Sequence, residues 1–247
     1  MKKALFFLAV FTVISFKTVV AQEASSVDHF DKVIISPYVQ ATLTKGDKES
    51  VTIQNCTVDR KKVHIESNGK TLRVYLEGAK EITKNEKVNE NGHEVKKPLY
   101  NGTVLTVAIT YKYLNDLSIR GEEIIRMNSK VEQEDFDLTI YGNAQVYFGE
   151  VQLRTMSTTI YGESHLELKS GNITEQKFTA YGESKVNAVG VKNITTKATL
   201  YGEAELKLNV SDLIKVTAFG NAKIGYLGNP EIRKFMTVGN AKIYKIN

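Results

Sequence analysis

The chain has 247 residues, of which 42% are hydrophobic and 25% are charged, so its composition excludes a disordered polar chain and fits one or two packed domains. Its formal net charge is +5, but removing Lys2, Lys3 and Lys17 with an N-terminal leader lowers the basic count from 33 to 30 against 28 acidic residues, which leaves +2. This small excess does not indicate a nucleic-acid partner. Cys56 is the only cysteine, which excludes an internal disulfide.

Residues 1–21 have the features of a secretory signal peptide. Lys2 and Lys3 precede an apolar run over residues 4–16, and small residues lead to a cleavage site after Ala21. A retained anchor is the alternative, but the run is shorter than the roughly 20 residues that span a bilayer. We therefore expect export to the periplasm, the cell surface or the medium, with no transmembrane segment after cleavage.

Residues 22–118 are predicted to form an N-terminal β region. Alternating apolar and polar runs over residues 30–78 are separated by short turn sequences, which is typical of strands. Residues 81–101 are polar and charged, so we expect a hairpin or excursion there rather than a core element. The sequence "TVLTVAITYKYLNDLSIRG" then resumes strand character.

Residues 119–247 contain a repeat centred on glycine. Successive spacings between the central glycines are 20, 20, 20, 18 and 19 residues, and these glycines are Gly142, Gly162, Gly182, Gly202, Gly220 and Gly239. A propeller blade needs about 40 residues, and most longer solenoid repeats contain a helix. The period therefore predicts an all-β fold, a β-solenoid or β-helix-like stack of roughly 20-residue coils with a narrow packed core.

Side-chain alternation in "TIYGESHLEL" assigns each residue to one side of the wall. Ile160, Ser164 and Leu166 share one parity and are predicted to point inward. Gly162 has the same parity and either lets opposite walls approach or supplies a bend with positive φ. The other parity forms outward columns, which we identify as a candidate ligand face: Tyr141, Tyr161, Tyr181 and Tyr201, with Glu163, Glu183 and Glu203 beside them.

Two other interpretations of these columns remain open at this stage. Stacked rings and amides stabilise neighbouring coils without binding anything. A bulge at the glycine would instead turn the tyrosines inward.

No catalytic motif stands out in the sequence. The four histidines are scattered, and the chain lacks a zinc-protease motif, a nucleophile elbow, a phosphate loop and a dinucleotide fingerprint. We therefore predict a non-enzyme without a cofactor or metal. Stacked glutamates leave two alternatives: a polysaccharide lyase or hydrolase that uses the acidic column, and calcium bound by the same oxygens.

The segments "FDKVIISPYVQATLTKGDKESVTIQ" and "LRVYLEG", followed by coils such as "LYGEAELKL", resemble the head GIN domain family of putative auto-transporter adhesins. Phe30-Asp31, Gly46-Asp47 and the glycine-centred coils carry the resemblance. It implies an all-β, solenoid-like fold at the cell envelope, and it brings no catalytic or ligand residues. The chain departs from the family where tyrosine replaces a small residue before the glycine, and where "SPYVQ" replaces a glycine-rich loop.

Together these features predict an exported, non-catalytic binding or adhesion module whose repetitive face binds a glycan or a cell-surface protein. The alternatives are the polysaccharide-active enzyme and a purely structural envelope protein. The sequence gives no oligomeric state.

Overall fold

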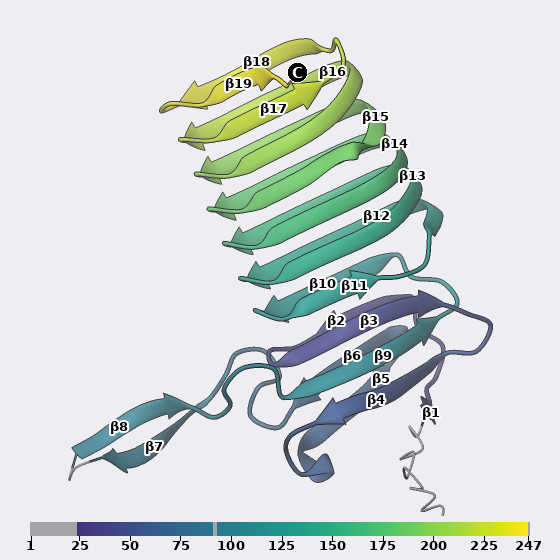
Figure 1. Ribbon diagram of the computed structural model, residues 1–247, viewed down its shortest axis with the longest axis vertical. Helices are drawn as coiled ribbons and strands as arrows, with labels where there is room; N and C mark the ends of the chain where they lie inside the picture. The colour runs from purple at the N-terminus through teal and green to yellow at the C-terminus, as the bar shows by residue number, and fades with distance from the viewer. Residues whose placement is uncertain (1–23, 91–92, 247) are drawn as a thin grey trace, which may run out of the picture.

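The computed structural model describes residues 24–90 and 93–246, so the predicted signal peptide lies outside the described residues. Parallel strands stack along one long axis and wind around a shared core (Figure 1). The prediction of an all-β solenoid is confirmed. Within the described ranges the only helical element is a 3-10 turn at Arg60–Lys62, and no helix is long and apolar enough to cross a membrane.

Five long strands form the regular part of the solenoid. They are β12 (Val131–Gly142), β13 (Gln145–Gly162), β14 (His165–Gly182), β15 (Lys185–Gly202) and β16 (Glu205–Gly220). Each pairs in parallel with the next, one coil further along, so that Tyr141 aligns with Tyr161 and Tyr161 with Tyr181. A bend after each glycine begins the next coil.

Two outward surfaces result from this winding. The tyrosine face is the outward side of the segments that end at the repeat glycines, residues 135–142, 155–162, 175–182, 195–202 and 213–220. The opposite face is the outward side of the segments that follow the bends, residues 145–148, 165–168, 185–188 and 205–209. Curved edges such as residues 149–154 connect the two.

The N-terminal strands continue the same stack, but in a different order from the sequence. β2 (Lys32–Ile35) pairs in parallel with β10 (Asp116–Gly121) on one side and with β6 (Thr71–Leu76) on the other. On the other sheet, β3 (Val39–Lys45) likewise lies between β11 (Ile124–Met127) and β9 (Leu105–Tyr111). The first coil of the chain is therefore inserted between two later ones.

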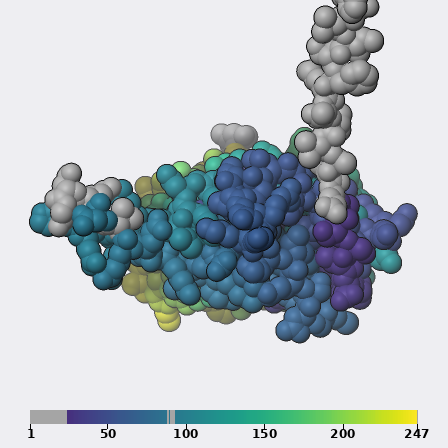
Figure 2. Space-filling view, turned by 90° about the horizontal axis from the view of Figure 1, so that it is seen from below, coloured from purple at the N-terminus to yellow at the C-terminus, as the bar shows by residue number. Residues whose placement is uncertain are grey.

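Antiparallel strands close the N-terminal end. β4 (Ser50–Cys56) pairs with β9, β5 (Val63–Asn68) pairs with β6, and β1 (Ala24–Ser26) pairs with β4. A separate hairpin of β7 (Asn85–Glu90) and β8 (His93–Pro98) projects sideways from this end (Figures 1 and 2).

The C-terminal end of the stack has exposed apolar side chains. It consists of β17 (Lys223–Leu227), β18 (Glu231–Val238) and β19 (Lys242–Lys245), which continue the parallel pairing. Phe235 is 70% exposed, and Met236 and Val238 are exposed as well. Among the described residues, antiparallel closing strands occur at the N-terminal end and not at the C-terminal end, so the two ends of the solenoid differ.

The core is one continuous hydrophobic cluster that runs from Phe30 to Ile224. Side chains alternate as predicted, because Ile160, Ser164 and Leu166 are no more than 1% exposed while Tyr161 and Glu163 lie outside. Burial of alternate apolar residues in every coil provides the main driving force for stacking.

The repeat glycines form the bends. Their φ angles lie between 101° and 123° from Gly142 to Gly239, a region that residues with a Cβ rarely adopt. A Cβ on Gly162 would lie 2.4 Å from the carbonyl oxygen of Gly142 in the preceding coil. Glycine therefore recurs because it bends the chain against a neighbouring backbone, and not because opposite walls approach.

Candidate functional site

The four predicted tyrosines form one column on the tyrosine face. Each is between 37% and 41% exposed. Neighbouring rings have centroids 4.8–5.0 Å apart and planes within 5° of parallel, and Phe219 extends the column at 5.1 Å from Tyr201. The strict register of the coils produces this regular spacing.

Ring orientation limits what the column can contact. Because each ring stacks on the next, its two faces are covered by neighbours, and only ring edges and hydroxyl groups point toward solvent. At the N-terminal end of the column, the guanidinium of Arg120 lies 5.1 Å from the centroid of Tyr141 and covers that ring. The column therefore offers hydroxyl groups and aromatic edges to a ligand, and its stacking also joins the coils.

The three predicted glutamates form a second column just after the glycine bends. Glu163, Glu183 and Glu203 are all exposed. The backbone N–H of Glu203 donates to the carbonyl of Gly182 at 3.0 Å, and its Oε1 accepts a hydrogen bond from Asn221 Nδ2 at 3.0 Å. The described residues contain no cluster of three or more His, Cys, Asp or Glu side chains suited to a metal.

The structure adds two columns that we did not single out from the sequence, although they repeat with the same period. A threonine column lies two positions before the tyrosines and contains Thr139, Thr159, Thr179, Thr199 and Thr217. A basic column lies two positions before the threonines and contains Lys177, Lys197 and Lys215. In the coils of β14 and β15 the outward order is thus lysine, threonine, tyrosine and then, past the bend, glutamate, whereas Asp137 and Ser157 occupy the lysine position in β12 and β13.

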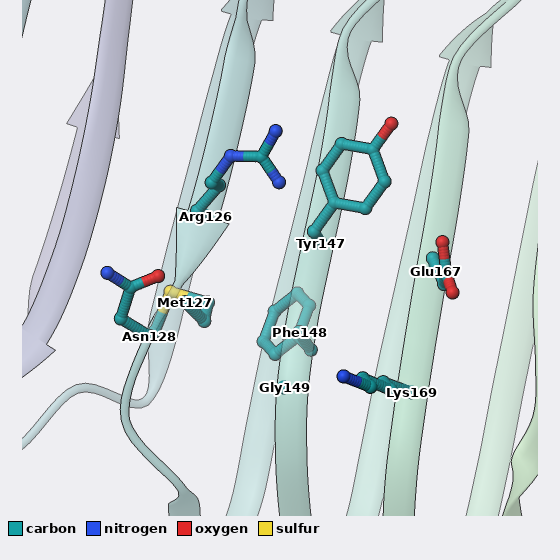
Figure 3. A pocket seen from close by; sticks show the side chains of 8 residues that line it. All are labelled: Arg126, Met127, Asn128, Tyr147, Phe148, Gly149, Glu167 and Lys169. Carbon is teal, nitrogen blue, oxygen red and sulfur yellow. The ribbon is translucent and has the colours of Figure 1, made fainter.

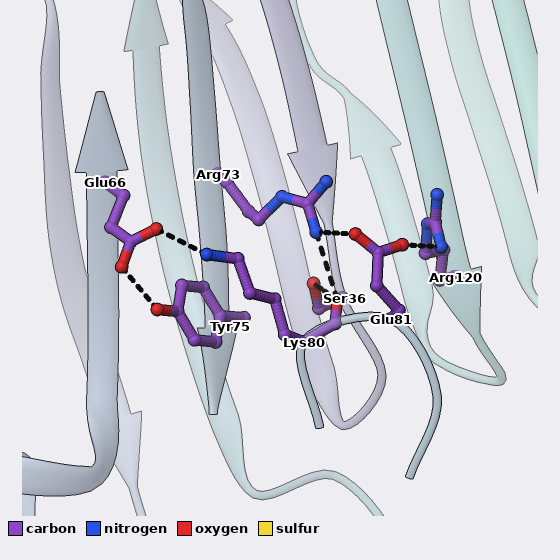
Figure 4. Close-up of polar contacts among 7 residues, drawn as sticks. All are labelled: Ser36, Glu66, Arg73, Tyr75, Lys80, Glu81 and Arg120. Carbon is purple, nitrogen blue, oxygen red and sulfur yellow. Dashed lines mark hydrogen bonds and ion pairs between the residues drawn. The ribbon is translucent and has the colours of Figure 1, made fainter. Parts of the chain in front are cut away.

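An ion-pair network holds the N-terminal end of the column in place (Figure 4). The carboxylate of Glu81 bridges the guanidinium groups of Arg73 and Arg120. The hydrogen bond from Arg73, followed by the charge of Arg120, lowers the pKa of Glu81 below its ordinary value. Because Arg120 also covers Tyr141, the network links β6 and the segment after it to the tyrosine column, which we also call the tyrosine ladder.

A second carboxylate in the same region lies inside the wall. Glu123 is only 8% exposed, and it occupies the inward position that Ala144, Ser164, Ser184, Ala204 and Ala222 fill in later coils. Its Oε2 accepts a hydrogen bond from the backbone N–H of Glu122 at 3.0 Å. Burial raises the pKa of Glu123 above its ordinary value.

The opposite face carries a shallow pocket with a volume of about 240 Å³ (Figure 3). Arg126 from β11 lies 4.7 Å from the ring centroid of Tyr147 on β13, while Glu167 and Lys169 from β14 form the other side. These side chains do not repeat from coil to coil, so the periodicity did not identify them. The tyrosine face remains the more extended and regular of the two surfaces.

Comparison with known proteins matches residues 29–230 to a family model described as "Putative auto-transporter adhesin, head GIN domain". No curated protein matches the sequence. Among solved structures, a putative adhesin from Bacteroides fragilis NCTC 9343 is similar with a TM-score of 0.75 and 16% identity, covering 91% of this chain and 96% of its own.

Two further structures come from the genus Parabacteroides. A putative adhesin from Parabacteroides merdae ATCC 43184 has a TM-score of 0.63 at 17% identity, covering 92% of this chain and 96% of its own. A protein from Parabacteroides distasonis ATCC 8503, described as a putative lipid binding protein, has a TM-score of 0.63 at 16% identity and covers 93% and 98%. At these identities the likeness shows a shared fold.

Proposed function

The chain belongs to the family of putative auto-transporter adhesins with a head GIN domain, and from this premise we propose that it is an exported, non-catalytic binding module of the cell envelope. The predicted signal peptide supports export. Solved neighbours described as adhesins support a binding role.

The tyrosine face is the proposed recognition surface. The observation that carries this proposal is the in-register ladder of tyrosine hydroxyls beside the column of Glu163, Glu183 and Glu203. Such a surface presents the same donors and acceptors once per coil. It therefore suits an extended partner with repeated polar groups, such as a glycan chain or a surface protein. The affinity of such a partner increases with the number of coils that it contacts.

Repetition also argues against the enzymatic alternative. A glycosidase needs one carboxyl group that stays protonated and a second that stays ionised, so their surroundings must differ. The coils give Glu163, Glu183 and Glu203 equivalent exposed positions after equivalent glycine bends. This supports a binding column over a catalytic pair.

A glycan array with the purified protein tests the proposal, and two triple variants identify the groups involved. Changing Tyr161, Tyr181 and Tyr201 to Phe removes the hydroxyl groups but keeps the stacked rings, as Phe219 does in the natural column. Changing Glu163, Glu183 and Glu203 to Gln removes the charges at nearly constant shape. Glu167→Gln on the opposite face is the control.

The proposal expects a ligand that binds the parent and the control but loses most of its affinity for either triple variant. If every ligand found for the parent binds both triple variants unchanged, the recognition face is wrong. A protein that binds no glycan and no surface protein, yet unfolds when the ladder is broken, would support the purely structural alternative.

A further inference from the structure

The outward columns of the tyrosine face and the glutamate column at its edge, just after the glycine bends, carry complementary charges. Within the coil of β14, Lys177, Thr179, Tyr181 and Glu183 follow one another at alternate positions, and the next coil repeats the order. We propose that this face pairs with the same face of a second copy of the chain, about a two-fold axis parallel to the solenoid axis. This inference rests on the proposed recognition face and names its partner.

The charges on the two copies favour a two-fold axis along the solenoid over one along the strands. Two orientations keep the strands of two copies aligned when they meet face to face: a two-fold axis along the solenoid and a two-fold axis along the strands. An axis along the strands places the lysine column over the lysine column of the second copy, and glutamate over glutamate, which is repulsive. An axis along the solenoid reverses the strand direction and keeps each coil level. It places Lys177 opposite Glu183 of the second copy.

The next coil gives the same match, because Lys197 then faces Glu203 of the second copy. Two-fold symmetry doubles each contact, so the arrangement forms four lysine–glutamate contacts at the two margins of the interface. Lys177 Nζ lies 3.5 Å from Glu175 Oε1, so the ammonium group is on this side of the wall. Opposed columns of unlike charge fix the orientation of two surfaces as they meet.

The relief of the tyrosine face is consistent with the same two-fold axis. The exposed tyrosine rings form a ridge along the solenoid, and the half-buried threonines form a lower row beside it. The axis along the solenoid lies between these two columns, so the ridge of each copy rests over the threonine row of the other. Ring edges and hydroxyl groups, the parts of the ladder left uncovered, then meet threonine methyl and hydroxyl groups.

The face is large enough for a specific interface. Eight strand residues at about 3.3 Å each and five coils at about 4.8 Å give a footprint of roughly 25 by 25 Å, or about 600 Å² on each copy. About 1,200 Å² in total clears the roughly 1,000 Å² expected of a biological interface. The β7–β8 hairpin projects sideways from the base and does not cover the broad faces in either view (Figures 1 and 2).

Sedimentation velocity of the purified protein over a concentration series tests this inference with matched charge variants. The acidic variant carries Lys177→Glu and Lys197→Glu, the basic variant carries Glu183→Lys and Glu203→Lys, and the exchanged variant carries all four changes. A control changes Lys185 and Lys223, which lie on the opposite face, to Glu.

We expect the parent, the control and the exchanged variant to dimerise. The acidic and basic variants should each lose affinity for themselves by at least about tenfold, and should form a heterodimer when mixed. Rescue in the exchanged variant shows that the charge changes do not act by unfolding the chain.

Three results would overturn the inference. The parent could stay monomeric at every concentration, the charge variants could dimerise like the parent, or the exchanged variant could stay monomeric. A monomeric parent that still binds a glycan through the tyrosine face would remove the dimer and leave the proposed binding function standing. A dimer with no other ligand would identify the second copy as the partner.

Discussion

A Cβ atom placed on Gly162 would lie 2.4 Å from the carbonyl oxygen of Gly142, closer than real Cβ contacts. The same relationship joins Gly182 to Gly162 and Gly202 to Gly182, at 2.6 and 2.7 Å. Each bend thus rests on the backbone of the bend before it, and the column of glycines fixes where every coil turns.

Gly182→Ala should therefore destabilise the protein. The new methyl group meets a backbone oxygen at a φ of 116°, so both crowding and backbone strain act, and we expect a loss of about 2–3 kcal/mol in the free energy of unfolding. Urea denaturation measures it. Gly149→Ala is the matched control, because its Cβ makes an ordinary 3.6 Å contact with Met127 O. Equal midpoints for the two variants would contradict this account of the repeat.

The tyrosine ladder should contribute to stability through its rings rather than its hydroxyl groups. Changing Tyr161, Tyr181 and Tyr201 to Ser removes four stacked contacts, worth about 0.5–1.5 kcal/mol each, so we expect a loss of about 2–6 kcal/mol. The corresponding triple change to Phe should cost much less. Chemical denaturation of both variants makes the comparison, and similar losses in the two would show that the hydroxyl groups carry the effect.

Glu123 should make stability fall as the pH rises. Its pKa is raised in the folded protein, so its contribution is fully present below the unfolded-state value, near 4.5, and is lost as the pH rises through the folded-state value. Glu123→Gln cannot ionise and should gain Tm relative to the parent as the pH rises above about 4.5. The exposed Glu163→Gln serves as the control, because Glu163 does not contribute to the pKa shift of Glu123. Parallel Tm profiles for the parent and Glu123→Gln would exclude this role.

Arg120 should stabilise the base of the ladder more than Arg126 stabilises the opposite face. Both guanidinium groups lie over a tyrosine ring, but Arg120 also pairs with Glu81, and the described residues give Arg126 no ion pair. We expect Arg120→Ala to cost about 1–2 kcal/mol and Arg126→Ala about half of that, measured by thermal unfolding. A larger loss at Arg126 would contradict the importance of the Glu81 network.

The regular coils were predictable because repetition supplies the register. Once Tyr161 and Tyr181 occupy equivalent positions, alternation alone places Ile160 inside and Glu163 outside, as the structure has them. Ring orientation was not predictable, since alternation gives the side of the wall but not the χ angles that stack one ring on another. Glu123 was missed for a related reason: it is the one large, charged residue in a column of alanine and serine.

The order in which the N-terminal strands pair could not be predicted from the sequence either. β2 finds its parallel neighbours in β6 and β10, which no repeated motif connects to it. Pairing between distant, unlike segments leaves no periodic signal, so only the strand character of this region could be predicted.

The placement of β2 between β6 and β10 predicts an order in which the coils fold. Lys32 and Asp116 are 84 positions apart in the chain and are joined by a hydrogen bond of 2.7 Å, so the first coil acquires both of its neighbours only after a long loop has closed. Every coil after β11 pairs with the coil before it, so we expect the later coils to add through local contacts once the base has closed. We therefore expect the N-terminal strands to provide the first edge on which the later coils stack, one coil after another.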